Sequence, residues 1–180
     1  MLFRSAAIKA KSDRKSIKDE LSKIPRLDLA KLNLYKANLR ELDFSYADCE
    51  LVYCEDTDCS SAHFEGADCS SAYFEGAYCG EAHFEGAYCL LAHFEGAICI
   101  KAHFEGADCL SAHFEGANCL EAHFEGADCL SAHFENTIGL TAEQLCRAKS
   151  LYDTIGLSDE MKKDIEKLND TIFKEPYEDA

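Results

Sequence analysis

The sequence predicts an all-β solenoid, in which a short unit repeats and stacks on its own copies. A ten-residue phrase, Ala-His-Phe-Glu-Gly-Ala-Asp-Cys-Leu-Ser, recurs with small changes from residue 62 to 136 and divides into two five-residue units of matching pattern. A unit this short can bury its apolar side only against its neighbours in a stack. Catalysis needs a few distinct residues that converge at one place, whereas almost every residue here has copies. We therefore expect a protein that is not an enzyme.

Residues 1–26 are expected to form an N-terminal capping helix. Their apolar side chains fall near one helical stripe, Ser16 and Asp19 have the spacing of a capping box, and Pro25 favours a helix end. A β-solenoid needs such a cap, because an uncovered end offers free backbone groups to other sheets.

Residues 27–136 carry the five-residue register. The central apolar place of each unit recurs in steps of five from Leu29 to Phe134, which makes 22 units. A second apolar or small residue stands two places earlier, the period-2 pattern of a strand with one side toward a core. The fifth place is often glycine, as at Gly86, which suits a tight turn.

The units resemble those of the pentapeptide-repeat family, written A-(D/N)-L-x-x. Residues 37–41 read Ala-Asn-Leu-Arg-Glu and match it fully, and residues 107–111 read Ala-Asp-Cys-Leu-Ser, with cysteine for leucine. The resemblance covers residues 27–136. It implies a right-handed, four-sided β-helix with 20 residues per coil, hence about 5.5 coils and a rod about 26 Å long at the strand spacing of β-structure.

Residues 20 apart should then stack in columns inside the rod, with large side chains on one pair of sides and small ones on the other. The expected aromatic columns are Phe64, Phe84, Phe104 and Phe124 and, opposite, Phe74, Phe94, Phe114 and Phe134. The expected cysteine columns are Cys49, Cys69, Cys89, Cys109 and Cys129, and Cys59, Cys79, Cys99 and Cys119.

The residues beside each phenylalanine should point outward and form two histidine–glutamate ladders. One ladder contains His63, His83, His103 and His123 beside Glu65, Glu85, Glu105 and Glu125. The other contains His93, His113 and His133 beside Glu75, Glu95, Glu115 and Glu135.

The two cysteine sides are less polar outside than an exposed surface usually is, and each is a candidate partner surface. The leucine ridge is formed by Tyr88, Leu90, Leu91, Leu110 and Leu130, and the isoleucine face by Tyr78, Ile98, Ile100 and Leu120. In the alternative interpretation, the C-terminal helix of the same chain folds back and covers these residues.

Residues 137–180 are expected to form a C-terminal helical cap or tail with two helices. Residues 141–144, Thr-Ala-Glu-Gln, have the pattern of a capping box that opens a helix through about Tyr152. A second helix should follow Ser158, and Thr-Ile-Gly-Leu precedes both, at 137–140 and 154–157. The tail resembles the C-terminal extension of uncharacterised bacterial members of the family.

Charge and cysteine usage narrow the function classes. Residues 27–136 contain 21 acidic and four basic side chains, a field that repels nucleic acids and membrane surfaces. Eleven cysteines, most of them inside the rod, indicate a reducing, bacterial-type cytoplasm rather than a disulfide framework. No pair of cysteines or histidines has zinc-site spacing along the chain. We expect no cofactor and no biological metal site, only adventitious binding by the outer ladders.

Two functions fit these observations. The first is a non-enzymatic protein-interaction scaffold, which in its simplest version self-associates, as a homodimer, through its apolar faces or the last helix. The alternative follows from the resemblance: some family members mimic DNA and bind type II topoisomerases such as gyrase. In that case the mimic surface would be the acidic ladders formed by Glu65, Glu75, Glu85, Glu95, Glu105, Glu115, Glu125 and Glu135. The chain departs from those members because no loop interrupts its coils.

Overall fold

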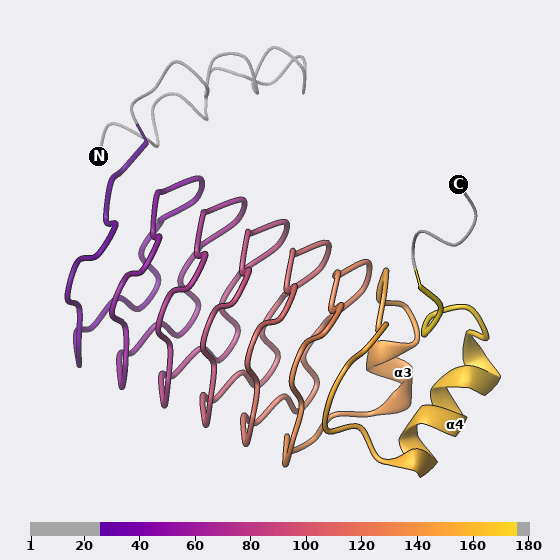
Figure 1. Ribbon diagram of the computed structural model, residues 1–180. Helices are drawn as coiled ribbons and strands as arrows, with labels where there is room; N and C mark the ends of the chain where they lie inside the picture. The colour runs from indigo at the N-terminus through magenta and orange to yellow at the C-terminus, as the bar shows by residue number, and fades with distance from the viewer. Residues whose placement is uncertain (1–25, 176–180) are drawn as a thin grey trace, which may run out of the picture.

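A computed structural model describes residues 26–175 of the chain. The helix expected over residues 1–26 lies outside the described residues, apart from Arg26. The chain winds into a stack of coils along one axis, and two helices, α3 (Ala142–Leu145) and α4 (Asp159–Leu168), lie at its C-terminal end (Figure 1).

Each side of a coil pairs with the same side of the next coil, 20 residues along. His63 and His83 form one such parallel bridge: the N–H of His83 donates to the carbonyl of Ala62 (2.9 Å), and its own carbonyl accepts from the N–H of Phe64 (2.7 Å). Bridges of this kind run from Asp28↔Asp48 to Asn118↔Ile138 at every fifth residue. The predicted 20-residue coil is therefore confirmed over this range.

The corners of the coil are four-residue turns with a left-handed residue in third place. The N–H of Ala67 donates to the carbonyl of Phe64 (3.0 Å), and Gly66 between them has φ +62°. Only glycine adopts this conformation without steric cost. Corners without glycine are also left-handed, as at Glu81 and Leu91, both at φ +55°.

The Asp/Asn preference of the unit has a local cause. The side-chain oxygen of Asp68 accepts the backbone N–H of Ser70 (3.2 Å), and Asn38 does the same for Arg40 (3.1 Å). Each side of the coil is too short for an ordinary strand ladder, so this short side chain supplies the acceptor for the backbone N–H two residues on.

The core consists of the predicted columns. The eight phenylalanines from Phe64 to Phe134 and the cysteines between them are at most 2% exposed. Phe84 stacks on Phe64 (ring centroids 4.9 Å apart) and meets Phe74 and Phe94 of the opposite column edge-on (5.5 and 5.4 Å). Two parallel stacks joined by edge-to-face contacts satisfy the preferred geometry of aromatic rings in both directions.

The ladder does not end at residue 136, where the sequence pattern breaks. Ile138 pairs with Asn118, as the 20-residue register requires, and then Ser150 pairs with Asp128 and Ile155 with His133, both at a separation of 22. The two additional residues accommodate α3, which lies between Ile138 and Ser150 in sequence. The coil therefore extends into the predicted helical tail.

The helix expected from Thr141 through about Tyr152 is much shorter. Its capping box is present, because the Thr141 hydroxyl accepts the N–H of Gln144 (3.3 Å) and the Gln144 side chain accepts the N–H of Thr141 (2.8 Å). The helix nevertheless ends at Leu145, since the backbone returns to the ladder: the carbonyl of Arg147 accepts the N–H of Gly126 (2.8 Å). Long-range pairing here overrides local helix propensity.

The second predicted helix, α4, begins after Ser158 as expected, and the Ser158 hydroxyl accepts the N–H of Met161 (3.1 Å). Its buried side chain, Ile165, belongs to the same hydrophobic cluster as the columns of the rod. Ile172 lies beyond the helix, where its side chain is buried and its backbone carbonyl accepts the N–H of Leu151 (2.9 Å).

Candidate functional site

The histidine–glutamate ladders are regular rows of paired side chains on two opposite sides of the rod. In most rungs the histidine Nδ1 lies 2.8–3.1 Å from the Oε1 of the glutamate two residues on, as in His63–Glu65 and His83–Glu85. The rings also stack between coils, with His63 and His83 centroids 4.7 Å apart and planes at 3°. Each ladder therefore combines carboxylates and imidazoles in a continuous column.

The last histidine of each ladder departs from this regularity, and His133 does so by contacting a glutamate of another coil. The Oε1 of Glu115 lies 3.0 Å from the Nδ1 of His113 in its own coil and 3.4 Å from the Nδ1 of His133 in the next. The ring of His133 is tilted by 35° against that of His113, whereas the other stacked histidine pairs lie within 5°. A single carboxylate oxygen is thus shared by two imidazoles.

The glutamates of the ladders are not freely solvated. In seven of them, from Glu75 to Glu135, Oε2 is buried and has no hydrogen-bond partner. An unsatisfied buried oxygen of a charged group is costly unless a proton, a cation or water compensates it.

Glu75 shows the consequence, because its rung has a tyrosine instead of a histidine. Tyr73 stands two residues before it, stacked between Tyr53 and His93 (both 5.0 Å). Burial raises the pKa of the Glu75 carboxyl above its usual value, and the negative charge of Glu95 adds to the rise.

The candidate partner surfaces lie on the two cysteine sides. Tyr78 and Leu120 of the isoleucine face are 52% and 46% exposed, and Ile98 and Ile100 between them are half-buried. The ladder adds Ile138, 59% exposed, to the same column through its pairing with Asn118. Because Ile138 lies beyond residue 136, where the predicted five-residue register ends, the pairing of coils is what places it in this column.

The leucine ridge is more acidic than the isoleucine face. Leu90, Leu110 and Leu130 are half-buried, and Asp108 and Asp128 stand in the adjacent column on the same side. The units of the isoleucine face carry their charges at the corners, where Lys101 pairs with Glu121 (3.7 Å), and Asn118 stands between Ile98 and Ile138 in the column.

The C-terminal helix does not cover either surface. Helix α4 lies across the end of the stack beside α3 rather than along a side (Figure 1). The exposure of Tyr78, Tyr88, Leu91 and Leu120, between 46% and 53%, agrees with this placement. The fold-back interpretation is therefore wrong for the described residues.

The cysteine columns consist of free thiols inside the rod. Hydrogen bonds with the thiols of neighbouring coils, together with burial, raise the pKa of Cys69 and Cys79 well above the ordinary value. Such thiols are protonated at neutral pH and pack as small apolar groups. Cys146 is half-buried, in contrast to the other cysteines.

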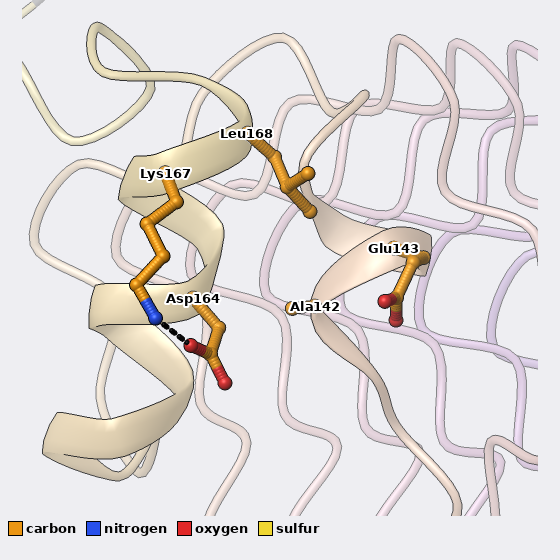
Figure 2. A pocket seen from close by; sticks show the side chains of 5 residues that line it. All are labelled: Ala142, Glu143, Asp164, Lys167 and Leu168. Atoms are coloured by element: carbon orange, nitrogen blue, oxygen red, sulfur yellow. Dashed lines mark hydrogen bonds and ion pairs between the residues drawn. The ribbon is translucent and has the colours of Figure 1, made fainter.

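A shallow hollow separates α3 from α4 (Figure 2). Ala142 and Glu143 line it on one side, and Asp164, Lys167 and Leu168 on the other. The Lys167 ammonium forms an exposed ion pair with Asp164 (2.6 Å), an arrangement that orders a helix surface and contains no nucleophile–base pair.

The structure brings together groups that a search for close pairs along the chain passes over. The sets with ligand atoms within 4.8 Å of one another are His63/Glu65/His83, His83/Glu85/His103, His113/Glu115/His133, Glu75/His93/Glu95 and Glu105/His123/Glu125. Each set joins residues 20 apart, so the 20-residue spacing is the sequence signal that could have revealed it.

Within the described residues 26–175, the structure has no helix with the length and apolarity needed to cross a membrane.

Comparison with known proteins agrees with this architecture. The model of the family described as pentapeptide repeats matches eight copies, over residues 53–88 and 102–138. None of the curated proteins matches the chain in sequence.

Several solved structures are similar. HetL, a pentapeptide repeat protein involved in heterocyst differentiation regulation from the cyanobacterium Nostoc sp. strain PCC 7120, is 24% identical, with a TM-score of 0.60 over 74% of this chain and 55% of HetL. The chain thus spans about half the length of HetL.

Two other similar structures have lower TM-scores. Rfr23 from the cyanobacterium Cyanothece 51142 is 25% identical (TM-score 0.33, 66% of this chain and 67% of Rfr23). QnrB1, a plasmid-mediated fluoroquinolone resistance protein, is 17% identical (TM-score 0.40, 75% of this chain and 82% of QnrB1).

The likeness to HetL concerns the fold, a right-handed quadrilateral β-helix, and that fold agrees with the 20-residue pairing of coils. Together with the matched repeats, these findings show that the chain contains repeats of the pentapeptide-repeat family, over residues 53–88 and 102–138.

Proposed function

We propose that the protein is a non-enzymatic scaffold that binds protein through the isoleucine face, and that its first partner is a second copy of the same chain. The observation that carries the proposal is the group of exposed and half-buried apolar side chains from Tyr78 to Ile138, on the side of an otherwise acidic rod where Lys101 pairs with Glu121 (3.7 Å). A contiguous exposed apolar surface of this kind is typical of interaction sites.

Electrostatics favours this face for self-association. The chain has a net charge of −16, so two copies repel each other except where the approaching surfaces carry little charge. A flat face with the same column in both copies is self-complementary under a twofold axis, the commonest symmetry of homodimers. Ten buried thiols support a reducing compartment for this role.

The test compares two matched substitutions. Ile100 and Leu110 occupy the same place in their units, on the isoleucine face and the leucine ridge respectively, and both are half-buried. We expect light scattering after size exclusion to show a dimer for the native chain and for Leu110→Glu, and a monomer for Ile100→Glu. A native chain that stays monomeric at every concentration would exclude self-association, and dissociation by Leu110→Glu alone would move the interface to the leucine ridge.

DNA mimicry is the second candidate, favoured by the carboxylate columns on opposite sides of the rod. The ladder geometry supports it less well, because Glu85, Glu95 and Glu105 each pair with a histidine and keep their second oxygen buried. Titration of the protein into a gyrase supercoiling assay tests it. Inhibition lost on changing Glu105, Glu115 and Glu125 to glutamine would make the ladders the site.

A further inference from the structure

We propose that His113, Glu115 and His133 form a binding site for a divalent transition-metal ion such as Zn²⁺ on the outside of the rod. The three side chains supply two imidazole nitrogens and one carboxylate oxygen, a donor set that zinc accepts with a further position open to water. The site goes beyond the protein-binding role proposed above and does not depend on it.

Two of the three separations between donor atoms are close to those around one ion, and all three lie within 4.8 Å. Ligands 2.0–2.2 Å from a tetrahedral zinc ion lie roughly 3.3–3.5 Å from each other. The Oε1 of Glu115 lies 3.0 Å from the Nδ1 of His113 and 3.4 Å from the Nδ1 of His133, so small side-chain rotations admit an ion among them. The side chains are 25–31% exposed, which leaves an entry path from solvent.

The tilt of His133 distinguishes this group from the other four. A carboxylate that contacts histidines of two coils occurs, within the described residues, only at Glu115, whereas the other histidine–glutamate contacts stay within one coil. The other groups should therefore bind metal more weakly.

Charge compensation favours a cation here. The Oε2 of Glu115 is buried without a hydrogen-bond partner, so its charge lacks a local counterpart on that side. The Oε2 of Glu135 is equally unpartnered and lies 3.9 Å from the Nδ1 of His133, so a second carboxylate adds negative charge beside the site. The acidic rod also raises the local concentration of cations.

Calorimetric titration of the metal-free full chain with ZnCl₂ tests the proposal. We expect one site tighter than the rest, with a Kd that rises at least tenfold in His133→Gln and in Glu115→Gln. Glu121→Gln is the matched control, because it removes an equal charge from an exposed corner outside every metal-ligand group. Cys146→Ser is the second control, since Cys146 carries the least buried thiol.

A measurement on the native chain tests the proposal even if a variant misfolds. Substoichiometric Co²⁺ should broaden the ring signals of His113 and His133 in the native chain before those of His83 or His103. The proposal is overturned if the tightest site survives His133→Gln in a folded variant, if Cys146→Ser abolishes it, or if Co²⁺ broadens all histidine signals equally. Zinc binding no tighter in the native chain than in Glu115→Gln would also overturn it.

Discussion

Tyr73 stacks on His93 with ring centroids 5.0 Å apart and planes at 5°, so a tyrosine occupies a place in the ladder that the next coils give to histidine. The stack continues without interruption, but the rung loses the nitrogen that holds the glutamate two residues on. Glu75 is the residue affected, and its pKa is raised by burial. The ladder therefore performs two separable tasks, ring stacking and carboxylate pairing.

Restoring the missing histidine tests this separation. Tyr73→His should place an Nδ1 beside Glu75, as at the 2.9 Å pair of His83 and Glu85, and lower the pKa of the Glu75 carboxyl. A hydrogen bond to a charged group at a partly exposed position should raise the free energy of unfolding by about 1 kcal/mol or less. NMR titration and urea unfolding measure the two effects. Ile98→His is the control for the titration, because Ile100 stands two residues on and the column neighbours Tyr78 and Asn118 offer no carboxylate.

Glu75→Gln should change stability with pH in a defined direction. A pKa raised in the folded state means that the folded chain holds the proton more tightly, so this contribution is present below the unfolded pKa and is lost as pH rises through the folded pKa. We expect Glu75→Gln to raise Tm at pH 7, with a gain that disappears near pH 4. Glu85→Gln should have the opposite effect at pH 7, because it breaks a 2.9 Å contact with His83. Equal responses of the two variants would contradict the explanation.

The corners offer a test of backbone strain without side-chain packing. An added Cβ at Gly86 (φ +62°) would meet no atom within 4 Å. Gly86→Ala should therefore lower the free energy of unfolding only by the cost of holding alanine in the left-handed conformation, about 1 kcal/mol. Glu81 already stands in that conformation at φ +55°, and Glu81→Gly should be stabilising by less than about 1 kcal/mol, because glycine loses more backbone entropy on folding. Urea unfolding measures both changes. If Gly86→Ala and Glu81→Gly changed the free energy of unfolding in the same direction, the corner residues would contribute through their side chains.

The aromatic columns should be most sensitive in the middle of the rod. Phe94 is 0% exposed and contacts four rings, stacked on Phe74 and Phe114 and edge-on to Phe84 and Phe104. Phe94→Ala should lower the free energy of unfolding by about 3–5 kcal/mol.

The matched variant is Phe44→Ala, near the first described coil. Phe44 is 8% exposed, and its ring partner among the described residues is Phe64 (5.2 Å). Its truncation should cost less, and a cost equal to that of Phe94→Ala in the same urea series would contradict a nearest-neighbour account of the stack.

Much of the fold could be predicted because the unit repeats a local rule. The place of Phe94 inside and of His93 outside follows from alternation along a strand, and the turn at Gly96 (φ +63°) from its fifth place in the unit. The helix after Thr141 was overestimated because its capping pattern is local, whereas its end at Leu145 depends on pairing with a distant coil.

The candidate sites were predicted less completely for the same reason. The isoleucine face was recognised from Tyr78 to Leu120, but Ile138 joins it only through its bridge to Asn118, outside the recognisable repeat. The sequence predicts only adventitious metal binding by the ladders, because His113 and His133 are 20 residues apart, beyond the spacing of familiar metal motifs, and the contact of Glu115 with both is not visible in the repeat.

The sequence by itself determined the five-residue unit, the inward and outward alternation and the acidic surface, because each of these depends on residues within one or two units. The tertiary structure alone decided which units meet. It placed Ile155 beside His133 at a separation of 22, turned the His133 ring toward Glu115 and laid α4 across the end of the rod. The physical reason is that contacts between coils depend on the closure of each turn of the chain, and a two-residue change in one turn alters every later pairing.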